Sequence, residues 1–335
     1  MRRILWTVTV LVVIFILVVV FFNDRFFKTR GKIDLSTGKW YGLAICYSGY
    51  RAGQSPQTGV YPSQEEISQD LNILQRNWRI IRVYGSDRHS EDILQVIDRE
   101  HIDLKVMLGI WLDGEPGHEE ENAGQIQTAI RLANDYPAIV IAVNVGNEIL
   151  VHWSNHKVPE ERVIGYVKQV QESISVPVTV ADDFLYWREH GAELADVVDF
   201  VTMHSYPIWG KQDIDTGLST TIEHFESVKA ALPGKTIVIG EAGWATYTVR
   251  ELHAPRAGDE KKQKRYFNEL TQWAEKNSIT VFFFEAFDEP WKGTGTEGHW
   301  GLFTEGRKAK LAMQDLYPDL MPDGPTSPDY PSTAP

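Results

Sequence analysis

The feature that most constrains the fold is a regular alternation of short apolar runs and longer amphipathic stretches. Most of the runs are continuously apolar, as in parallel strands that are covered on both faces. The eight predicted strands span residues 40–46, 80–85, 104–110, 139–146, 176–182, 198–206, 236–243 and 280–287. Helical periodicity is found at residues 63–77, 90–101, 124–136, 159–173, 220–232 and 259–277. Strands that alternate with helices in this way predict a parallel α/β sheet.

The number of units indicates how this sheet closes. Eight strand-and-helix units in about 280 residues favour a (β/α)8 TIM barrel over an open sheet. An open sheet of the nucleotide-binding kind would carry a glycine-rich phosphate loop after its first strand, and neither GxGxxG nor GxxxxGK[ST] occurs in the chain. We therefore predict an α/β protein whose folded domain, residues 31–316, is a TIM barrel.

Two glutamates end strands of this predicted barrel. Glu148 closes IAVNVGNE (141–148), and Glu241 follows TIVIG (236–240) directly. Barrel enzymes hold their catalytic groups at the carboxyl ends of the strands, so both side chains are expected at the same mouth. An unpaired carboxylate is costly to bury, and two of them facing one site are what hydrolysis of a glycosidic bond requires. The alternative is that each is an ordinary loop carboxylate.

The N-terminus carries a different signal. Residues 4–22 form an uncharged apolar run of 19 residues, long enough to cross a bilayer core of roughly 30 Å as a helix. We expect an uncleaved transmembrane helix within an anchor of residues 1–30. A signal peptide is the alternative, but this run exceeds the usual apolar length of about 7–15 residues, and no A-x-A-like site follows it.

Composition limits the class of partner. The net charge is −13, which argues against nucleic acid, because phosphate binding needs clustered Lys and Arg. A neutral polymer fits better. The single cysteine, Cys46, excludes an internal disulfide. Residues 317–335 are rich in Pro, Ser, Asp and Thr, and we expect them to form a disordered tail.

Taken together, the strand-end motifs resemble glycoside hydrolase family 17, the β-1,3-glucanases and β-1,3-glucanosyltransferases. The similarity spans about residues 40–312 and is carried by NVGNE (144–148), GEAGW (240–244), RVYG (82–85), DEPWK (288–292) and HWGLF (299–303). It implies a retaining glycosidase acting on β-1,3-glucan. The alternatives are a glucanosyltransferase with the same residues, a non-catalytic glucan-binding envelope protein and a membrane-anchored assembly factor.

The resemblance also implies roles for individual residues. Glu148 would be the general acid/base and Glu241 the nucleophile, with carboxyl groups about 5–5.5 Å apart. Asn147 would hold the 2-hydroxyl of the sugar, and Tyr206 would donate a hydrogen bond to Glu241. Tyr84 would contact the sugar. The alternative is that Asn147 is a turn residue and that Tyr206 and Tyr84 only pack against neighbouring side chains.

Further residues are expected around this pair. The segment after the last strand carries charged residues that match the family and would support the site, namely Glu289, Lys292 and Glu297; the alternative is a solvated run of charges. Aromatic faces stack against sugar rings, so some of the 11 tryptophans are expected to line a cleft. We expect Trp209, Trp244, Trp291 and Trp300 to line this cleft.

No metal site and no cofactor are expected. The chain has no HExxH motif, and the spacing of His152 and His156 lacks a partner motif. No GxSxG is present, which disfavours a serine hydrolase. The expected partners are a neutral β-glucan polysaccharide or oligosaccharide and, through the N-terminal helix, the membrane. Because such a substrate lies outside the cytoplasm, we expect a single-pass protein with its barrel periplasmic or at the cell surface.

Overall fold

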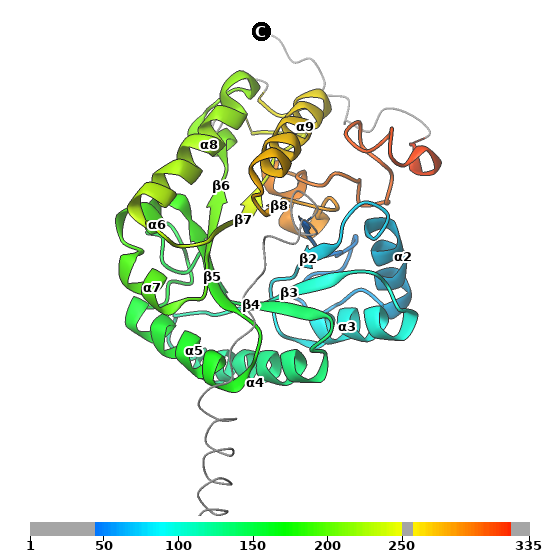
Figure 1. The fold of residues 1–335 in the computed structure, drawn as a ribbon. Coiled ribbons are helices and arrows are strands. Elements are labelled where there is room, and N and C mark those ends of the chain that lie inside the picture. The colour runs from blue at the N-terminus through cyan, green and yellow to red at the C-terminus, as the bar shows by residue number, and fades with distance from the viewer. Residues whose placement is uncertain (1–43, 250–256, 323–335) are drawn as a thin grey trace, which may run out of the picture.

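The structure, a computed structural model, describes residues 44–249 and 257–322 (Figure 1). In this part of the chain, eight parallel strands pair in chain order, and β8 returns to pair with β1, which closes the barrel. The strands are β1 (Ala44–Cys46), β2 (Ile80–Arg82), β3 (Lys105–Ile110), β4 (Val140–Asn147), β5 (Val178–Asp183), β6 (Val201–Ser205), β7 (Ile237–Ala242) and β8 (Val281–Phe283). The predicted barrel is confirmed.

Helices surround the barrel as an outer layer (Figure 1). They are α2 (Gln64–Leu74), α3 (Arg88–Glu100), α4 (Glu119–Asp135), α5 (Glu160–Ser173), α6 (Phe184–Glu189), α7 (Ala192–Val197), α8 (Ile214–Ala231) and α9 (Glu260–Asn277). The sequence left the connection between β5 and β6 unassigned. This connection holds α6 and α7, each of 6 residues, which are too short to show a helical period.

The strands are apolar throughout because they are buried on both faces. Every residue of β5, β6 and β7 is buried, with one face in the barrel interior and the other against the helices. Close packing also governs the turn after β7. A Cβ at Gly243 would lie 2.0 Å from the carbonyl oxygen of Phe284, so only glycine fits where the chain leaves the strand that carries Glu241.

The folded part extends past the predicted boundary at residue 316. Tyr317 is fully buried, and its hydroxyl donates to the carbonyl oxygen of Ile73 at 3.0 Å. A short 3-10 turn, η5 (Pro318–Leu320), follows it, and Arg76 pairs with Asp319. Composition placed these residues in the tail because Pro and Asp are common there. One aromatic anchor is enough to hold the first part of that segment against α2.

The predicted transmembrane run, residues 4–22, lies outside the described residues. Among the helices that the structure does describe, none is both long and apolar enough to cross a bilayer.

A buried ion pair ties the C-terminal segment to the first helix. Arg307 binds the carboxylate of Asp70 on α2 with two hydrogen bonds, of 2.7 and 2.6 Å, and donates to the carbonyl oxygen of Gly49 at 2.8 Å. Arg51 and the hydroxyl of Tyr47 also reach the Asp70 carboxylate, each at 3.2 Å. Asp70 is fully buried, so its charge depends on these donors.

Removing one side of this pair would leave buried arginine charge without its partner. We expect Asp70→Ala to lower the free energy of unfolding by about 3–5 kcal/mol, measured by equilibrium denaturation. Asp319→Ala is the matched control, because its pair with Arg76 is largely exposed and such pairs contribute about 0–1 kcal/mol. Equal, small losses in the two variants would contradict the structural role of the buried pair.

Candidate active site

A large cavity opens at the carboxyl ends of the strands. Its volume is about 1460 Å³, and both Glu148 and Glu241 line it. The walls come from the loops that follow the strands, so residues distant in sequence meet here. Many aromatic side chains line the cavity, among them Tyr84, Trp111, Trp153, Tyr206, Trp209, Phe284, Trp291 and Trp300.

Glu241, near the end of β7, is buried and held by donors on both oxygens. Arg82 donates to Oε1 at 2.5 Å, and the hydroxyl of Tyr206 donates to Oε2. Burial alone would raise the pKa of Glu241, but electrostatic interactions with His204 and Arg82 and the hydrogen bonds from Tyr206 and Arg82 outweigh it and lower the pKa to about 2. Glu241 is therefore an ionised carboxylate at neutral pH.

Glu148 follows β4 through an unusual backbone turn. Gly146 and Glu148 both have positive φ, of +88° and +50°; this region is open to glycine and uncommon for glutamate. The Glu148 amide donates to the carbonyl oxygen of Ala181 on β5 at 2.9 Å. This turn leaves the Glu148 side chain about 30% exposed, so its environment is wetter than that of Glu241.

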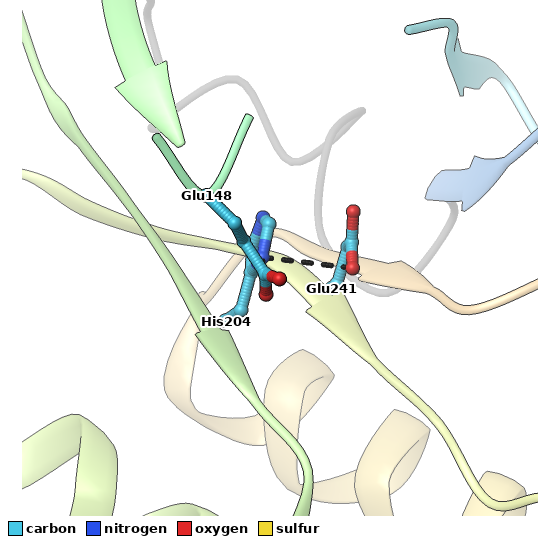
Figure 2. Close-up of side chains that lie close together, drawn as sticks. All are labelled: Glu148, His204 and Glu241. Atoms are coloured by element: carbon cyan, nitrogen blue, oxygen red, sulfur yellow. Dashed lines mark hydrogen bonds and ion pairs between the residues drawn. The ribbon is translucent and has the colours of Figure 1, made fainter. Parts of the chain in front are cut away.

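His204 stands between the two glutamates, as Figure 2 shows. Its Nδ1 lies 2.9 Å from Glu148 Oε1 and 3.5 Å from Glu241 Oε2. Because Nδ1 faces two carboxylates, it carries a proton. An oxygen of each glutamate and this nitrogen lie within 4.8 Å of one another. That separation agrees with the 5–5.5 Å or so of retaining glycosidases and is shorter than the 6.5–9.5 Å or so of inverting ones.

Arg82, at the end of β2, joins the two strand ends. Its guanidinium donates to Asn147 Oδ1 at 2.5 Å as well as to Glu241. The amide oxygen of Asn147 is thereby occupied, which leaves its NH₂ group as the part available to a ligand. The guanidinium also lies 4.7 Å from the ring centroid of Tyr84, so Arg82 packs under a tyrosine that lines the cavity.

The charged residues after β8 form a buried cluster. Lys292 lies 2.5 Å from a carboxylate oxygen of Glu289 and 3.5 Å from one of Glu285. Burial, with Glu289 beside it, raises the pKa of Glu285 well above its usual range. The pKa of Glu289 is lowered, because Lys292 and hydrogen bonds outweigh burial. The cluster therefore pairs the Lys292 ammonium with the Glu289 carboxylate, and its burial favours the protonated form of Glu285.

Only some of the predicted residues of this region reach the cavity. Lys292 and Glu297 line it. Glu289 is buried and lies outside its lining, so its contacts are with Lys292 and with the indole N–H of Trp291, which donates to it at 3.1 Å. Glu289 thus supports Lys292 instead of facing a ligand.

The four predicted tryptophans differ in where the structure places them. Trp209, Trp291 and Trp300 line the cavity. Trp244 does not, so its assignment to the cleft was wrong. Its indole is fully buried beneath α8 and α9, donates to the carbonyl oxygen of Ala257 at 2.9 Å and packs on Tyr266. The residue follows Glu241 by three positions, but the turn after β7 directs it outward into the helical layer.

Two kinds of site residue escaped the sequence analysis. The sequence analysis gave His204 no role. His204 lies on β6, two residues before Tyr206, which follows the strand. Residues two apart in extended chain point to the same side, so both side chains face the barrel mouth. Trp111 and Trp153 were not chosen, yet they line the cavity with 41% and 46% of their surfaces exposed. Both tryptophans follow strands, β3 and β4, at the carboxyl ends that form the barrel mouth, and this position in the sequence could have identified them as cavity residues.

The three groups around His204 also form the candidate cation site of the described residues. Two carboxylate oxygens and one imidazole nitrogen are suitable donors for a divalent transition metal. His204 Nδ1 is hydrogen-bonded to Glu148 and lies within ion-pair distance of Glu241, and these contacts account for the proximity of the three groups without an ion.

A barrel with two close glutamates at its mouth has the architecture and chemistry of a glycoside hydrolase. Residues 44–301 match the BtgE/BtgC glycoside hydrolase domain, and the chain belongs to this family. The resemblance to glycoside hydrolase family 17 is thereby confirmed.

Three relatives illustrate the similarity. The glucan endo-1,3-β-glucosidase btgC of Emericella nidulans is 28% identical over 78% of this chain and 44% of its own length. An endo-laminarinase from Formosa is 28% identical, with a TM-score of 0.74 over 89% of this chain and 94% of its own. The family 17 β-1,3-glucanosyltransferase of Rhizomucor miehei, at 22% identity, shares the fold, with a TM-score of 0.69 over 81% and 96% of the two chains. The matched region spans about two fifths of the curated btgC relatives, 40% and 44% in two of them.

The depressed pKa of Glu241 predicts a pH-dependent contribution to stability. A carboxylate whose pKa falls on folding stabilises the fold above its unfolded pKa, and this stabilisation is lost as pH falls through the folded value. With a folded pKa of about 2, the unfolding free energy of wild type minus that of Glu241→Gln should shrink as pH falls from about 4.5 towards 2. Denaturant titrations at several pH values measure it, with the exposed Glu120→Gln as control. A constant difference over this range would contradict an ionised, charge-stabilised Glu241.

Proposed function

We propose that this protein is a retaining glycosidase that cleaves β-1,3-linked glucan through Glu148 and Glu241. The observation that carries the proposal is the approach of one oxygen of each glutamate to within 4.8 Å in a cavity of about 1460 Å³. Such a separation is shorter than the 6.5–9.5 Å or so that inverting enzymes use to place an attacking water, and it suits direct attack by one carboxylate. The cavity is large enough for several sugar units.

Glu241 is the proposed nucleophile. Its carboxylate is ionised at neutral pH because Arg82 and Tyr206 donate to it. It would attack the anomeric carbon, while the bond from that carbon to the leaving oxygen breaks and a glycosyl ester forms. Asn147, with its amide oriented by Arg82, would hold the 2-hydroxyl, where hydrogen bonding strengthens in the oxocarbenium-like transition state.

Glu148 is the proposed acid/base. In the first step it would give its proton to the leaving oxygen, and in the second it would take a proton from the water or sugar hydroxyl that attacks the ester. The negative charge thus moves from Glu241 to Glu148 when the ester forms. The Nδ1–H of His204, 2.9 Å from one glutamate and 3.5 Å from the other, can donate to whichever of them is charged.

The linkage is proposed from the relatives. The names of the Emericella and Formosa proteins specify a glucan endo-1,3-β-glucosidase and an endo-laminarinase. A glucanosyltransferase is the second candidate, because the same two glutamates would serve transfer and because the Rhizomucor neighbour bears that name. A non-catalytic glucan-binding protein is disfavoured by the ionised, fully supported Glu241, which binding alone does not require.

The activity is tested with linear β-1,3-gluco-oligosaccharides, with β-1,4-glucan as control and chromatography of the products. We expect shorter products from a hydrolase, and also longer ones if transfer occurs. Glu241→Ala should reduce turnover by a factor on the order of 10⁴ or more, because the covalent step is lost. Undiminished activity in this variant would refute the nucleophile assignment, and binding without turnover by the wild type would favour the non-catalytic alternative.

The acid role of Glu148 is tested by varying the leaving group. Glu148→Gln should slow cleavage of natural glucans by roughly 10²–10⁴-fold, because their sugar leaving groups need a proton. Formation of the glycosyl ester from an aryl β-glucoside with a good leaving group should slow far less, as followed by the burst of released phenol. Equal slowing of both substrates would argue against Glu148 as the acid. The exposed Glu120→Gln again serves as control.

We also propose that residues 4–22 anchor the protein in a membrane as a single-pass helix, with the barrel outside the cytoplasm. The uncharged length of 19 residues supports the anchor, and the polymeric substrate supports the location. Flanking charge points the other way, since Arg2 and Arg3 precede the run whereas Arg25, Lys28, Arg30 and Lys32 follow it.

Cell fractionation tests this anchor. The full chain is expected in the membrane fraction, and its barrel should be open to protease added to intact cells or spheroplasts. Deletion of residues 1–30 should release a soluble protein that keeps its glucanase activity. A full chain that fractionates as soluble would refute the anchor, and protease resistance in intact cells with sensitivity after lysis would refute the location.

A further inference from the structure

One part of the cavity, here called its arm, lies beside the ends of β5 and β6. It is lined by Phe184 and Leu185 at the start of α6 and by Thr220 and His224 of α8. Thr220 and His224 are four residues apart, so they occupy the same face of their helix. This arm takes no part in the chemistry assigned to Glu148 and Glu241.

His224 is held in this arm from two directions. Its ring stacks on Phe184, with centroids 3.5 Å apart and planes inclined by 9°. Its Nδ1 lies 2.9 Å from the hydroxyl oxygen of Ser205, a fully buried residue of β6. Arg188 lies over the Phe184 ring, with its guanidinium carbon 5.5 Å from the ring centroid. These contacts fix the plane and the rotation of the imidazole.

The other ring nitrogen is free for a ligand. His224 Nε2 has no hydrogen-bond partner among the described residues, and the ring lines the cavity. Burial, aided by the positive charge of Arg188, lowers the pKa of His224 to about 4, so the imidazole is neutral at neutral pH. A neutral, fixed imidazole suits a hydrogen bond to an uncharged hydroxyl. Ser205 has no exposed surface, so the pair is not a serine–histidine nucleophile.

The position of the arm assigns it to one side of the scissile bond. Glu148 is joined to the end of β5, since its amide donates to Ala181 and the amide of Leu150 donates to Asp182 at 2.8 Å. Phe184 follows this strand end directly. Since Glu148 would protonate the leaving oxygen, the arm beside it lies on the leaving-group side.

We propose that Phe184 and His224 form a subsite for a sugar unit on the leaving-group side, with His224 Nε2 hydrogen-bonded to a hydroxyl of that unit and Ser205 as its positioning residue. This inference rests on the proposed glycosidase function. The unit bound here departs during cleavage and is the one that an acceptor sugar would replace in transfer. The subsite therefore selects substrates, and acceptors, that extend beyond the cleaved bond.

The test compares two substrates in the full-length protein. Laminaripentaose can place sugars on both sides of the bond, whereas an aryl β-laminaribioside places only its aryl group on the leaving-group side. We expect His224→Ala to lower the ratio of kcat/KM for the pentaose to that for the aryl substrate about tenfold, the effect of about one lost hydrogen bond. His224→Gln, whose amide can still bind a hydroxyl, should restore part of this ratio. His190→Ala, an exposed histidine outside the cavity, is the matched control.

The outcomes separate the two proposals. An unchanged ratio in His224→Ala, with thermal unfolding like that of the wild type, would overturn the subsite while the glycosidase function stands. If the variant is destabilised, the ratio is measured below its unfolding temperature, where a global defect would lower both substrates together and would also count against the subsite. A wild type that cleaves neither substrate would overturn the proposed function and, with it, the subsite.

Discussion

Arg82 is a charged side chain with no solvent exposure at the centre of the barrel mouth, and the geometry of the site depends on how its charge is compensated. An unpaired buried guanidinium would cost several kcal/mol. Glu241 supplies the opposite charge, and Asn147 and the carbonyl oxygen of Gly240 accept further hydrogen bonds, at 2.5 and 3.2 Å. A single cation thus fixes the ends of β2, β4 and β7 relative to one another. It also keeps Glu241 ionised, which is the state that a nucleophile requires.

The fold and the central pair could be predicted from sequence because both depend on local pattern. Continuous apolar runs predict strands that are buried on both faces, and eight of them leave few topologies. Glu148 and Glu241 were identifiable because a charged residue at the end of such a run needs a reason to be there. Asn147, Tyr206 and Tyr84 followed from the family motifs, and all three line the cavity.

The errors share a different cause, which is side-chain direction. Trp244 stands three residues after Glu241 but points into the helical layer, because the chain turns sharply at Gly243. Glu289 lies in a motif with Lys292, yet only the lysine reaches the cavity. His224 lies on a helix, far in sequence from every strand end, and meets Phe184 and Ser205 only after α8 packs beside α6. No periodicity or motif in one sequence encodes such contacts.

The two sides of the cavity have different physical requirements. On the Glu241 side, charges are paired: Arg82 forms an ion pair with Glu241, and Lys292 forms an ion pair with Glu289 beside Glu285. On the Glu148 side, the wall carries the rings of Phe184, His224, Trp111 and Trp153, together with the carboxyl groups of Asp113, Glu121 and Asp183. This asymmetry agrees with the order of the reaction. The donor sugar must be held while charge moves, whereas the leaving unit must bind and then depart.

The choice between hydrolysis and transfer follows from the same asymmetry. In the proposed mechanism both reactions would begin with the same ester on Glu241 and use the same base, so the two glutamates cannot distinguish them. The outcome depends on whether water or a sugar hydroxyl occupies the space beside Glu148 once the first product has left. A wall that binds sugar units by stacking and by a neutral donor raises the local occupancy of acceptors without adding charge. The residues that decide the product would then be those of the leaving-group side, and a barrel of this family could change from hydrolase to transferase without any change in Arg82, Glu148 or Glu241.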